Sequence, residues 1–162
     1  MSSYQFYVKV KGSKQGAFKG ESPMVDRTDW INGVRFRFKG EIPLDPQRGL
    51  SSGLPRHDPI VVTKLWGASS PQILQAFWDA EVLDEVIIEF VEADGQGNPE
   101  TVYEQITLKR AVVAQLERYS DKTEEGLTAR PSREFEDVGF KAEEIVVKNL
   151  RSKTMARYAA KG

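Results

Sequence analysis

Histidine, the commonest general base in enzymes, occurs once among the 162 residues of the chain, as His57. It lies between Arg56 and Asp58, and an Asp adjacent in sequence cannot readily orient the imidazole ring as the acid of a catalytic triad does. The chain has no Cys, which excludes disulfides, Cys-based zinc sites and thiol nucleophiles. We therefore interpret His57 as a polar contact in a loop, and we predict no catalytic residue, no metal site and no cofactor.

Acidic residues provide no stronger candidate for catalysis. Three pairs of neighbouring carboxylates occur in the second half of the chain: Glu124–Glu125, Glu136–Asp137 and Glu143–Glu144. Neighbours along a strand point to opposite faces, so we expect these pairs to be solvated rather than to act together as acid and base. The segment 94–98 (DGQGN) lacks the spacing and the final Glu of a calcium loop, and a hairpin turn explains it. The residue types therefore indicate a binding or structural protein.

Length and charge favour one self-associating domain. A chain of 162 residues is typical of a single domain. It has neither an apolar run long enough for a transmembrane helix nor a signal-peptide pattern at its start, so we expect folding in the cytoplasm. The net charge is +4 over residues 1–80 (11 Lys/Arg, 7 Asp/Glu) and −5 over residues 81–162 (12 and 17), which suits self-association. The cations are dispersed, so nucleic acid is not an expected partner.

Alternating apolar residues predict two strands near the start of the chain. Residues 4–10 carry apolar side chains at the even positions, which we expect to point inward. Residues 34–39 repeat this pattern, and their odd positions carry three cations: Arg35, Arg37 and Lys39. Three cations on one face cannot lie in a core. We therefore regard this face as a possible lumen or interface face.

A Pro-rich and Gly-rich segment follows these strands. Residues 40–59 contain four Pro, three Gly and two Ser, so we predict a long extended loop rather than a strand pair. Loops of about twenty residues are uncommon in compact domains and usually carry function. A disordered surface excursion is an equal alternative.

The most organised stretch comes after this loop. Ile60–Trp66 is a short apolar run, which predicts a strand buried on both faces. Ser-Ser-Pro at 69–71 is typical of a helix start, with a Ser as the cap, so a short α-helix is predicted over about residues 70–79. Its apolar stripe would dock the helix on a sheet. We interpret both Ile60–Trp66 and Ile73–Trp78 as core.

The second half of the chain returns to strands. Residues 86–93 and 101–119 predict two of them, and the length of the second predicts a bend or bulge near Arg110. A polar loop is expected over residues 120–133. The next strand, over about residues 138–147, changes its apolar parity part-way.

The C-terminal end is basic, with five cations and no acid from Lys148 onward, and we predict a tail or a weak terminal helix. We divide the chain into one domain, residues 1–150, and a basic tail, residues 151–162. Six or more strands, one short helix and no βαβ rhythm predict a mainly β fold, an antiparallel barrel or sandwich with one docked helix.

Several motifs occur in a fixed order along the chain. R-H-D-P at 56–59 is followed by I-V-V-T-K at 60–64 and by S-S-P-Q-I-L-Q-A at 69–76. Near the N-terminus, residues 16–22 match a G-x-x-x-G-E-S pattern, and F-x-x-V-x-F-x-A-x-x-I occupies 135–145. This combination resembles the haemolysin-coregulated protein (Hcp) family, the tube subunit of type VI secretion systems, over nearly the whole chain.

The resemblance implies a two-sheet β-barrel with one flanking helix. It also implies hexameric rings that stack into a hollow tube, which a contractile sheath expels with effectors in its lumen. The implied partners are further copies of the chain, the sheath, spike and baseplate proteins and the secreted effectors, with export through the apparatus and no membrane insertion. The loop over 40–59 would reach a neighbouring ring. Its candidate assembly residues are Asp45, Gln47, Arg48, Leu50, Leu54, Arg56, His57 and Asp58.

Two other classes of protein remain as alternatives. A phage-like contractile tail tube protein is expected to share the fold and to serve a different machine. A monomeric ligand-binding β-barrel would require a closed apolar cavity, and the cationic face of residues 34–39 favours a wet surface instead.

Overall fold

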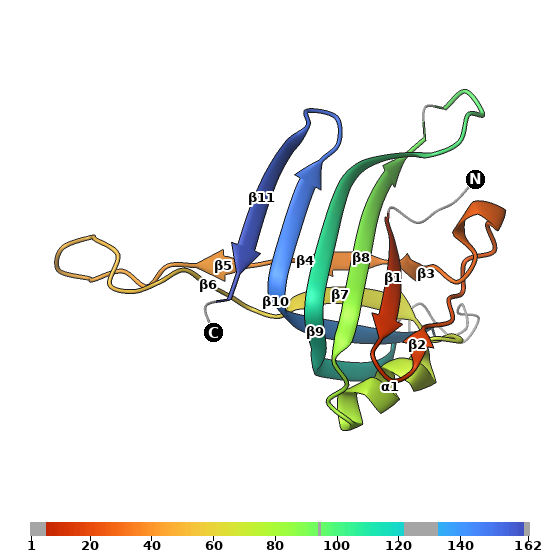
Figure 1. Cartoon of the computed structure of the whole chain (residues 1–162), viewed down its shortest axis with the longest axis horizontal. Helices are drawn as coiled ribbons and strands as arrows, with labels where there is room; N and C mark the ends of the chain where they lie inside the picture. Colours follow the sequence, from red (N-terminus) through yellow and green to blue (C-terminus); the bar gives the residue numbers. More distant parts are fainter. Residues whose placement is uncertain (1–5, 94, 122–132, 161–162) are drawn as a thin grey trace, which may run out of the picture.

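The computed structural model describes residues 6–93, 95–121 and 133–160, and consists of antiparallel strands with one α-helix packed against their lower end (Figure 1). The helices are the 3-10 helix η1 (Val25–Arg27) and α1 (Ser70–Trp78). The strands are β1 (Phe6–Gly12), β2 (Gly16–Ala17), β3 (Ile31–Gly33), β4 (Arg35–Arg37), β5 (Gly40–Glu41), β6 (Arg56–His57), β7 (Ile60–Leu65), β8 (Leu83–Glu92), β9 (Thr101–Asp121), β10 (Arg133–Asn149) and β11 (Thr154–Ala159). The predicted mainly β class with one α-helix is confirmed.

The two predicted sheets are two layers of one bent sheet. Nine strands follow the order β2-β1-β8-β9-β10-β7-β4, with β11 added to β10 and β3 added to β1. In Figure 1, β11, β10, β9, β8 and β1 rise side by side, while β4, β7 and the other halves of β9 and β10 cross them. β9 and β10 belong to both layers because both bend. The predicted bend is confirmed: Arg110 has φ 50°, and the β9–β10 register shifts between Gly139 and Phe140.

Aromatic side chains fill the space between the layers. Phe6, Phe36 and Phe90 come from three different strands and pack ring to ring, with centroids 5.1 to 6.1 Å apart. Each such pair contributes ~0.5–1.5 kcal/mol beyond the burial of its area. Gly33 lies against this cluster, and a Cβ there would approach the Phe6 ring to 1.9 Å. The cluster therefore holds β1, β4 and β8 together across the interior.

Burial differs from the predicted parity at three positions near the N-terminus. Tyr7, predicted to point outward, is buried, because the guanidinium of Arg27 lies 4.7 Å from its ring centroid and covers it. Val34 and Phe38, predicted to point inward, are exposed. The physical reason is that β3 pairs with β1 and β4 pairs with β7, so only Phe36 of this stretch packs on the core.

The helix docks by a narrower stripe than its sequence predicts. Ile73 and Ala76 are buried, whereas Phe77 and Trp78 are exposed, Trp78 by 69%. Trp66, at the end of β7, is exposed as well. The interpretation of these three aromatic residues as core is therefore wrong. The helix is only nine residues long and packs on β9, so only the side facing that strand is covered.

Residues 40–59 project from the body as an arm (Figure 1). The predicted extended character is confirmed, but the root of the arm is a ladder in which β5 and β6 pair, so the prediction of a loop without a strand pair is wrong there. Nearer the tip, the N–H of Asp45 donates to the carbonyl of Leu50 at 2.7 Å. Gly49 has φ 67°, a conformation that favours glycine. Local hydrogen bonds therefore shape the tip.

The C-terminal end also differs from its prediction. Thr154–Ala159 forms β11, which pairs with β10, where the sequence predicted a tail or a weak helix. The basic composition concealed this strand because pairing uses the backbone and not the side chains. The division at residue 150 stays a prediction, and most of the predicted loop over 120–133 lies outside the described residues. Within the described part of the chain, no helix is long and apolar enough to cross a membrane.

Candidate functional site

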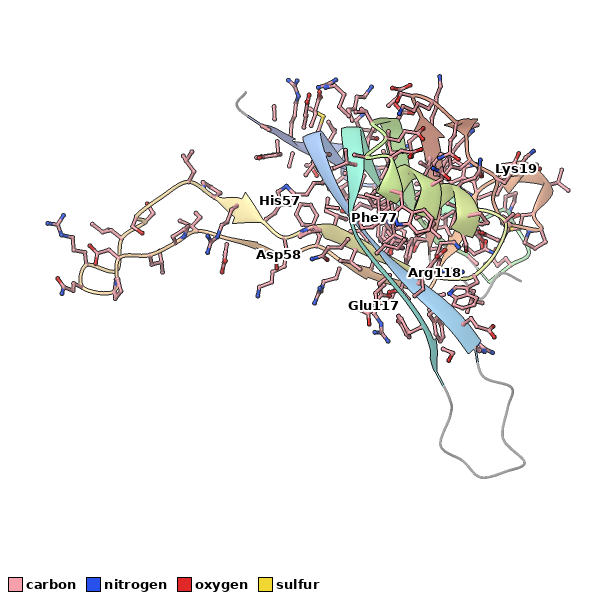
Figure 2. All side chains as sticks on the ribbon, turned by 90° about the horizontal axis from the view of Figure 1, so that it is seen from below. Lys19, His57, Asp58, Phe77, Glu117 and Arg118 are labelled. Carbon is pink, nitrogen blue, oxygen red and sulfur yellow. The ribbon has the colours of Figure 1, made fainter. Side chains whose placement is uncertain are left out.

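The arm carries the predicted assembly residues, and it exposes apolar side chains. Figure 2 shows the arm extending from the body, with His57 and Asp58 where it joins. The large apolar residues exposed on it, Leu54 by 74%, are Ile42, Leu44, Leu50 and Leu54. Scattered exposed apolar residues are ordinary, but four on one projecting segment form a surface typical of protein interaction sites.

The polar candidates lie along both sides of the arm. Arg56 pairs with Glu41 at 3.0 Å across the root, but both side chains are more than half exposed, so the pair adds little stability. Near the tip, the N–H of Gln47 donates to the Asp45 carboxylate at 2.9 Å, which holds a turn. Arg48 is exposed in this turn.

A groove of about 570 Å³ lies at the root of the arm. The His57 ring stands edge-on between Phe38 and Tyr158, with centroids 5.7 and 5.5 Å away. Lys141 donates a hydrogen bond to the carbonyl of His57. His57 therefore links the arm to β11 and to the body, and Ile145 and Tyr158 form the body side of the groove.

The predicted cationic face is exposed. Arg35, Arg37 and Lys39 all point to the exterior of β4 and of the residues that follow it. Arg37 lines a second groove, of about 440 Å³, together with Glu117 and Asp137. Arg37 therefore faces a surface of mixed charge, and the role of the three cations in a lumen or an interface stays a prediction.

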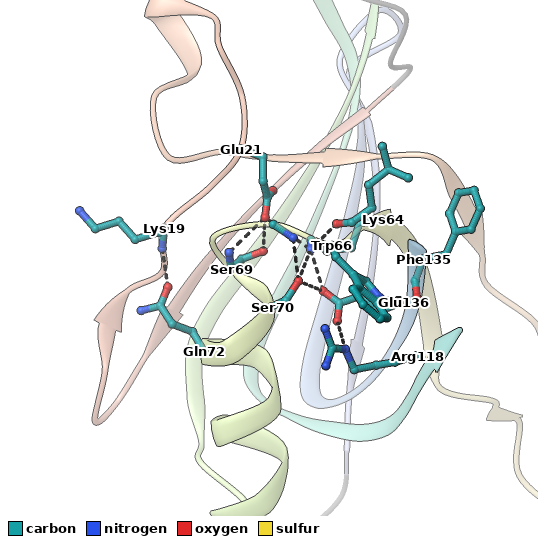
Figure 3. A network of polar contacts seen from close by, with 12 residues as sticks. Lys19, Glu21, Lys64, Trp66, Ser69, Ser70, Gln72, Arg118, Phe135 and Glu136 are labelled. Atoms are coloured by element: carbon teal, nitrogen blue, oxygen red, sulfur yellow. Dashed lines mark hydrogen bonds and ion pairs between the residues drawn. The ribbon is translucent and has the colours of Figure 1, made fainter. Parts of the chain in front are cut away.

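The most buried polar cluster lies where β7 leads into α1 (Figure 3). The Lys64 ammonium is 1% exposed and donates to the Glu136 carboxylate at 2.7 Å, to Ser70 Oγ at 3.1 Å and to the Leu65 carbonyl at 2.7 Å. A lysine has three donors, and here each has an acceptor. The Glu136 side chain is fully buried. Breaking a buried pair of this kind by removing one partner typically costs ~3–5 kcal/mol.

Glu21 joins this cluster from the segment after β2. Its carboxylate lies 3.4 Å from Lys64 Nζ and accepts hydrogen bonds from Ser69 Oγ at 2.6 Å and Ser69 N–H at 3.1 Å. The sequence leaves open which serine caps the helix. The Ser69 hydroxyl makes no capping hydrogen bond, and Glu21 satisfies the Ser69 amide at the helix start instead. Gly67 permits this approach, since a Cβ there would lie 2.2 Å from Glu21 Cγ.

Arg118 closes the cluster on the solvent side. Its Nε lies 3.4 Å from the second carboxylate oxygen of Glu136, and its guanidinium stacks over the Trp66 ring at 4.1 Å. The Trp66 indole N–H donates to the Phe135 carbonyl at 2.7 Å, which fixes the ring. Exposed Trp66 thus shields a buried carboxylate instead of filling the core.

The sequence missed this cluster. The prediction that Glu136 is solvated is wrong, because Lys64 on β7 and Arg118 on β9 lie directly opposite it in the two neighbouring strands. The available signal was Lys64 itself, since a lysine inside an apolar run requires a carboxylate partner. Sequence alone could not identify that partner, which lies 72 positions away.

A second buried carboxylate, Glu81, joins the end of α1 to the turn after β1. It accepts hydrogen bonds from the Lys14 N–H at 3.0 Å and from the N–H and side-chain amide of Gln15 at 2.9 and 3.0 Å. Burial raises the pKa of Glu81, but these hydrogen bonds outweigh burial and hold the pKa below its ordinary value. A Cβ at Gly12 would lie 2.0 Å from this carboxylate, so the contact requires a glycine there.

The buried cluster around Lys64 has the arrangement of a structural network and not that of a catalytic site. The 3.1 Å separation of Ser70 Oγ and Lys64 Nζ resembles serine–lysine catalysis. However, the Ser70 hydroxyl donates a hydrogen bond to the Glu136 carboxylate at 2.6 Å, and all three side chains are buried. Among the described residues, no group of three His, Asp or Glu side chains is arranged to hold a metal ion.

Three sequence motifs therefore meet in one network: Glu21 of G-E-S, Lys64 of the T-K pair, and the serines of S-S-P. The family model described as "Type VI secretion system effector, Hcp" matches residues 7–148. The chain belongs to the Hcp family. The buried cluster is thus the place in this Hcp chain where the motifs of the resemblance come together.

Individual relatives agree with this assignment. The chain is 29% identical to the "Major exported protein" of Pseudomonas aeruginosa over 143 residues, covering 83% of this Hcp chain and 82% of the relative. The structure described as "Crystal structure of Hcp protein" has a TM-score of 0.87 at 20% identity and covers 97% of this chain and 98% of its own. Hcp3 from Pseudomonas aeruginosa has a TM-score of 0.71 at 20% identity over 97% and 98%. These structures share the fold.

Proposed function

We propose that this Hcp chain is the tube subunit of a type VI secretion system. Subunits associate side by side into hexameric rings, the rings stack into a hollow tube, and the sheath expels that tube. Effectors travel in its lumen, and the spike and baseplate are its other partners in the apparatus. The family match over residues 7–148 is the observation that carries this proposal.

The surface of the arm favours an assembling protein over a monomeric one. It presents exposed leucines on a segment that projects from the body, and hydrogen bonds hold its tip in one shape. A projecting arm of this kind reaches a neighbouring subunit at little ordering cost. We assign it to the contact between stacked rings, through the candidate residues from Asp45 to Asp58.

Export of the chain is part of the same proposal. The Pseudomonas aeruginosa relative carries the name "Major exported protein", which supports a secreted fate for this chain as well. The buried polar clusters fix how segments of the fold meet, and we assign the chain a structural and carrier role and no catalytic one.

The alternative of a monomeric ligand-binding barrel is less well supported. Such a protein needs an apolar cavity between its layers, and here the interior contains the packed rings of Phe6, Phe36 and Phe90. A phage-like tail tube protein remains the second candidate, because it shares the expected fold. The genes beside this one distinguish a phage tail from a secretion apparatus.

Mass photometry and negative-stain electron microscopy of the purified full chain test the proposal. We expect annular particles with six times the 18.3 kDa mass of one chain, and stacks of them at high concentration. A protein that stays monomeric and shows no annular particles at any concentration up to its solubility limit is not a tube subunit.

A further inference from the structure

The outermost strand of the rising layer, β11, has an open edge. It pairs with β10 on one side and with no other described strand. All six of its residues are exposed, and Arg157 is the one charged residue among them. Natural proteins usually protect edge strands with several charges, prolines or bulges, because an open edge pairs readily with another chain. β11 lacks this protection and is therefore suited to a contact with a partner.

The surface around β11 is basic. We call residues 148–160 the basic flank; it contains four cations and no acid. Arg151 pairs with Glu92 and Arg157 pairs with Glu144. Lys148 and Lys153 have no ion-pair partner within the described chain, and the apolar residues exposed beside them are Leu150, Met155 and Tyr158.

The opposite side of the same layer is acidic. We call residues 21–30, which cover β1 and contain η1, the acidic flank; it holds three acids and one cation. Arg27 is neutralised by Glu89 at 2.8 Å, and Glu21 is turned into the buried cluster. Asp26 and Asp29 have no ion-pair partner in the part of the chain described, and Val25 beside them is 90% exposed.

The two flanks point away from each other within one subunit. In Figure 1, β11 forms the left side of the rising layer, and the orange segment with η1 lies on the right beyond β1. Closed rings require this arrangement, because each subunit offers two different surfaces and each surface contacts the other kind on the next copy.

We propose that the basic flank of one subunit binds the acidic flank of the next, and that this contact closes the ring. Lys148 and Lys153 face Asp26 and Asp29 of the neighbouring copy, while Val25 packs against the apolar side chains beside β11. The partner is a second copy of this chain because the two flanks carry opposite charges and each exposes apolar side chains that the other can cover. A symmetric contact of either flank with itself would oppose like charges. The inference rests on the ring-forming function proposed above and names its interface.

Cysteine cross-linking tests this contact directly, because the natural chain contains no Cys. We expect Val25→Cys combined with Ala156→Cys to form a ladder of disulfide-linked multimers on mild oxidation. Val25→Cys alone and Ala156→Cys alone should remain uncross-linked, since a head-to-tail contact places unlike positions together. A matched control is Val25→Cys with Asp84→Cys, which is exposed away from the basic flank. Dimers from either single variant, or ladders from the control pair alone, overturn the proposal.

Charge reversal supplies an independent test. Asp26→Lys with Asp29→Lys, and separately Lys148→Glu with Lys153→Glu, should each raise the concentration needed for half-assembly roughly tenfold. Combining all four changes should restore much of the loss, because the two flanks again carry opposite charges. Asp84→Lys with Glu134→Lys matches the first charge change at exposed positions elsewhere. Mass photometry measures the fraction of rings.

The outcomes of these experiments distinguish a wrong interface from a wrong ring proposal. If the natural chain forms rings and the reversed variants assemble equally well, the interface is wrong and the tube function stands. If the natural chain forms no rings under any condition, the tube function fails before the interface is tested. Weaker assembly of both reversed variants without rescue by the combination also overturns the pairing of these two flanks.

Discussion

A buried lysine ammonium loses its hydration, and Lys64 recovers the loss only through fixed acceptors on three segments of the chain. Glu136 supplies most of the compensation, at 2.7 Å, and Ser70 and the Leu65 carbonyl complete it. Because desolvation and pairing nearly cancel, the cluster contributes specificity more than net stability. Its role is to fix how the start of α1 meets β7 and β10.

This balance predicts that Lys64 and Glu136 are strongly coupled in their effect on stability. We expect Lys64→Met and Glu136→Leu to lower the free energy of unfolding by ~3–5 kcal/mol each, because each leaves the other charge buried without its nearest partner, with only a weaker ion pair at 3.4 Å. The double variant should lose clearly less than the sum of the two. Urea denaturation of each variant under conditions where the protein is monomeric measures these values.

The same chain offers a matched control. Lys109 and Glu85 are also opposite each other in neighbouring strands, but both are well exposed and 3.5 Å apart. Lys109→Met and Glu85→Leu should each change stability by only about 0.5 kcal/mol, as is usual for surface substitutions. Equal losses at the buried and the exposed pair would show that burial does not make the Lys64 cluster special.

The lowered pKa of Glu81 predicts that the free energy of unfolding depends on pH. Its folded-state pKa is below the ordinary value, so its contribution is fully present above the unfolded pKa, about 4.3, and is lost as pH falls through the folded pKa. Glu81→Gln should therefore destabilise the protein by ~1–3 kcal/mol at pH 7, and the difference should narrow below about pH 4. Thermal or urea unfolding across this range measures it. Exposed Glu117→Gln is the control, and a gap at Glu81 that stays constant to low pH contradicts the linkage.

At the scale of elements, α1 shows that a hydrophobic side chain on a helix is not always a buried one. We expect Ile73→Ala to cost ~2–5 kcal/mol, because it leaves a cavity between the helix and the sheet. Trp78→Ala should cost less than about 1 kcal/mol, because the side chain is largely in solvent. Urea denaturation of the two variants measures both losses of stability. A larger loss for Trp78→Ala than for Ile73→Ala would show that Trp78 is part of the core.

Sequence predicted correctly the long strands with alternating side chains and the continuous apolar run of β7. Val86 and Ile88 are buried as their spacing indicates, and the bend at Arg110 follows from a run too long for one flat strand. The short pairs at the arm root and the β11 strand were missed, because both depend on which backbone lies alongside. The exposure of Trp78 was missed because hydrophobicity does not reveal which side of a helix its neighbours reach.

At the scale of the whole molecule, the two proposed contacts use different segments of the subunit. The flanks of the rising layer point sideways, and the arm projects at its root from the crossing layer beside β11. If the flanks close the ring, the arm is free to join one ring to the next. Changes at the arm tip and charge changes in the flanks should then act independently, while Tyr158, which belongs both to the basic flank and to the groove at the arm root, is shared. The sequence predicted the candidate residues of the arm but not the flanks, because the flanks form only when 21–30 folds over β1 and 154–159 joins β10.

Removal of the arm tip tests this division of roles. Deleting residues 46–54 should leave rings intact and weaken their stacking, because the deletion removes Leu50 and Leu54 and leaves both flanks unchanged. Leu50→Ser with Leu54→Ser should weaken stacking in the same direction without shortening the arm, while Ser51→Ala with Ser52→Ala serves as the control. Ring mass by mass photometry and stack length in negative stain are the two readouts. Loss of rings on deletion would mean that the arm closes the ring, because the flank contact alone could not then hold six subunits together.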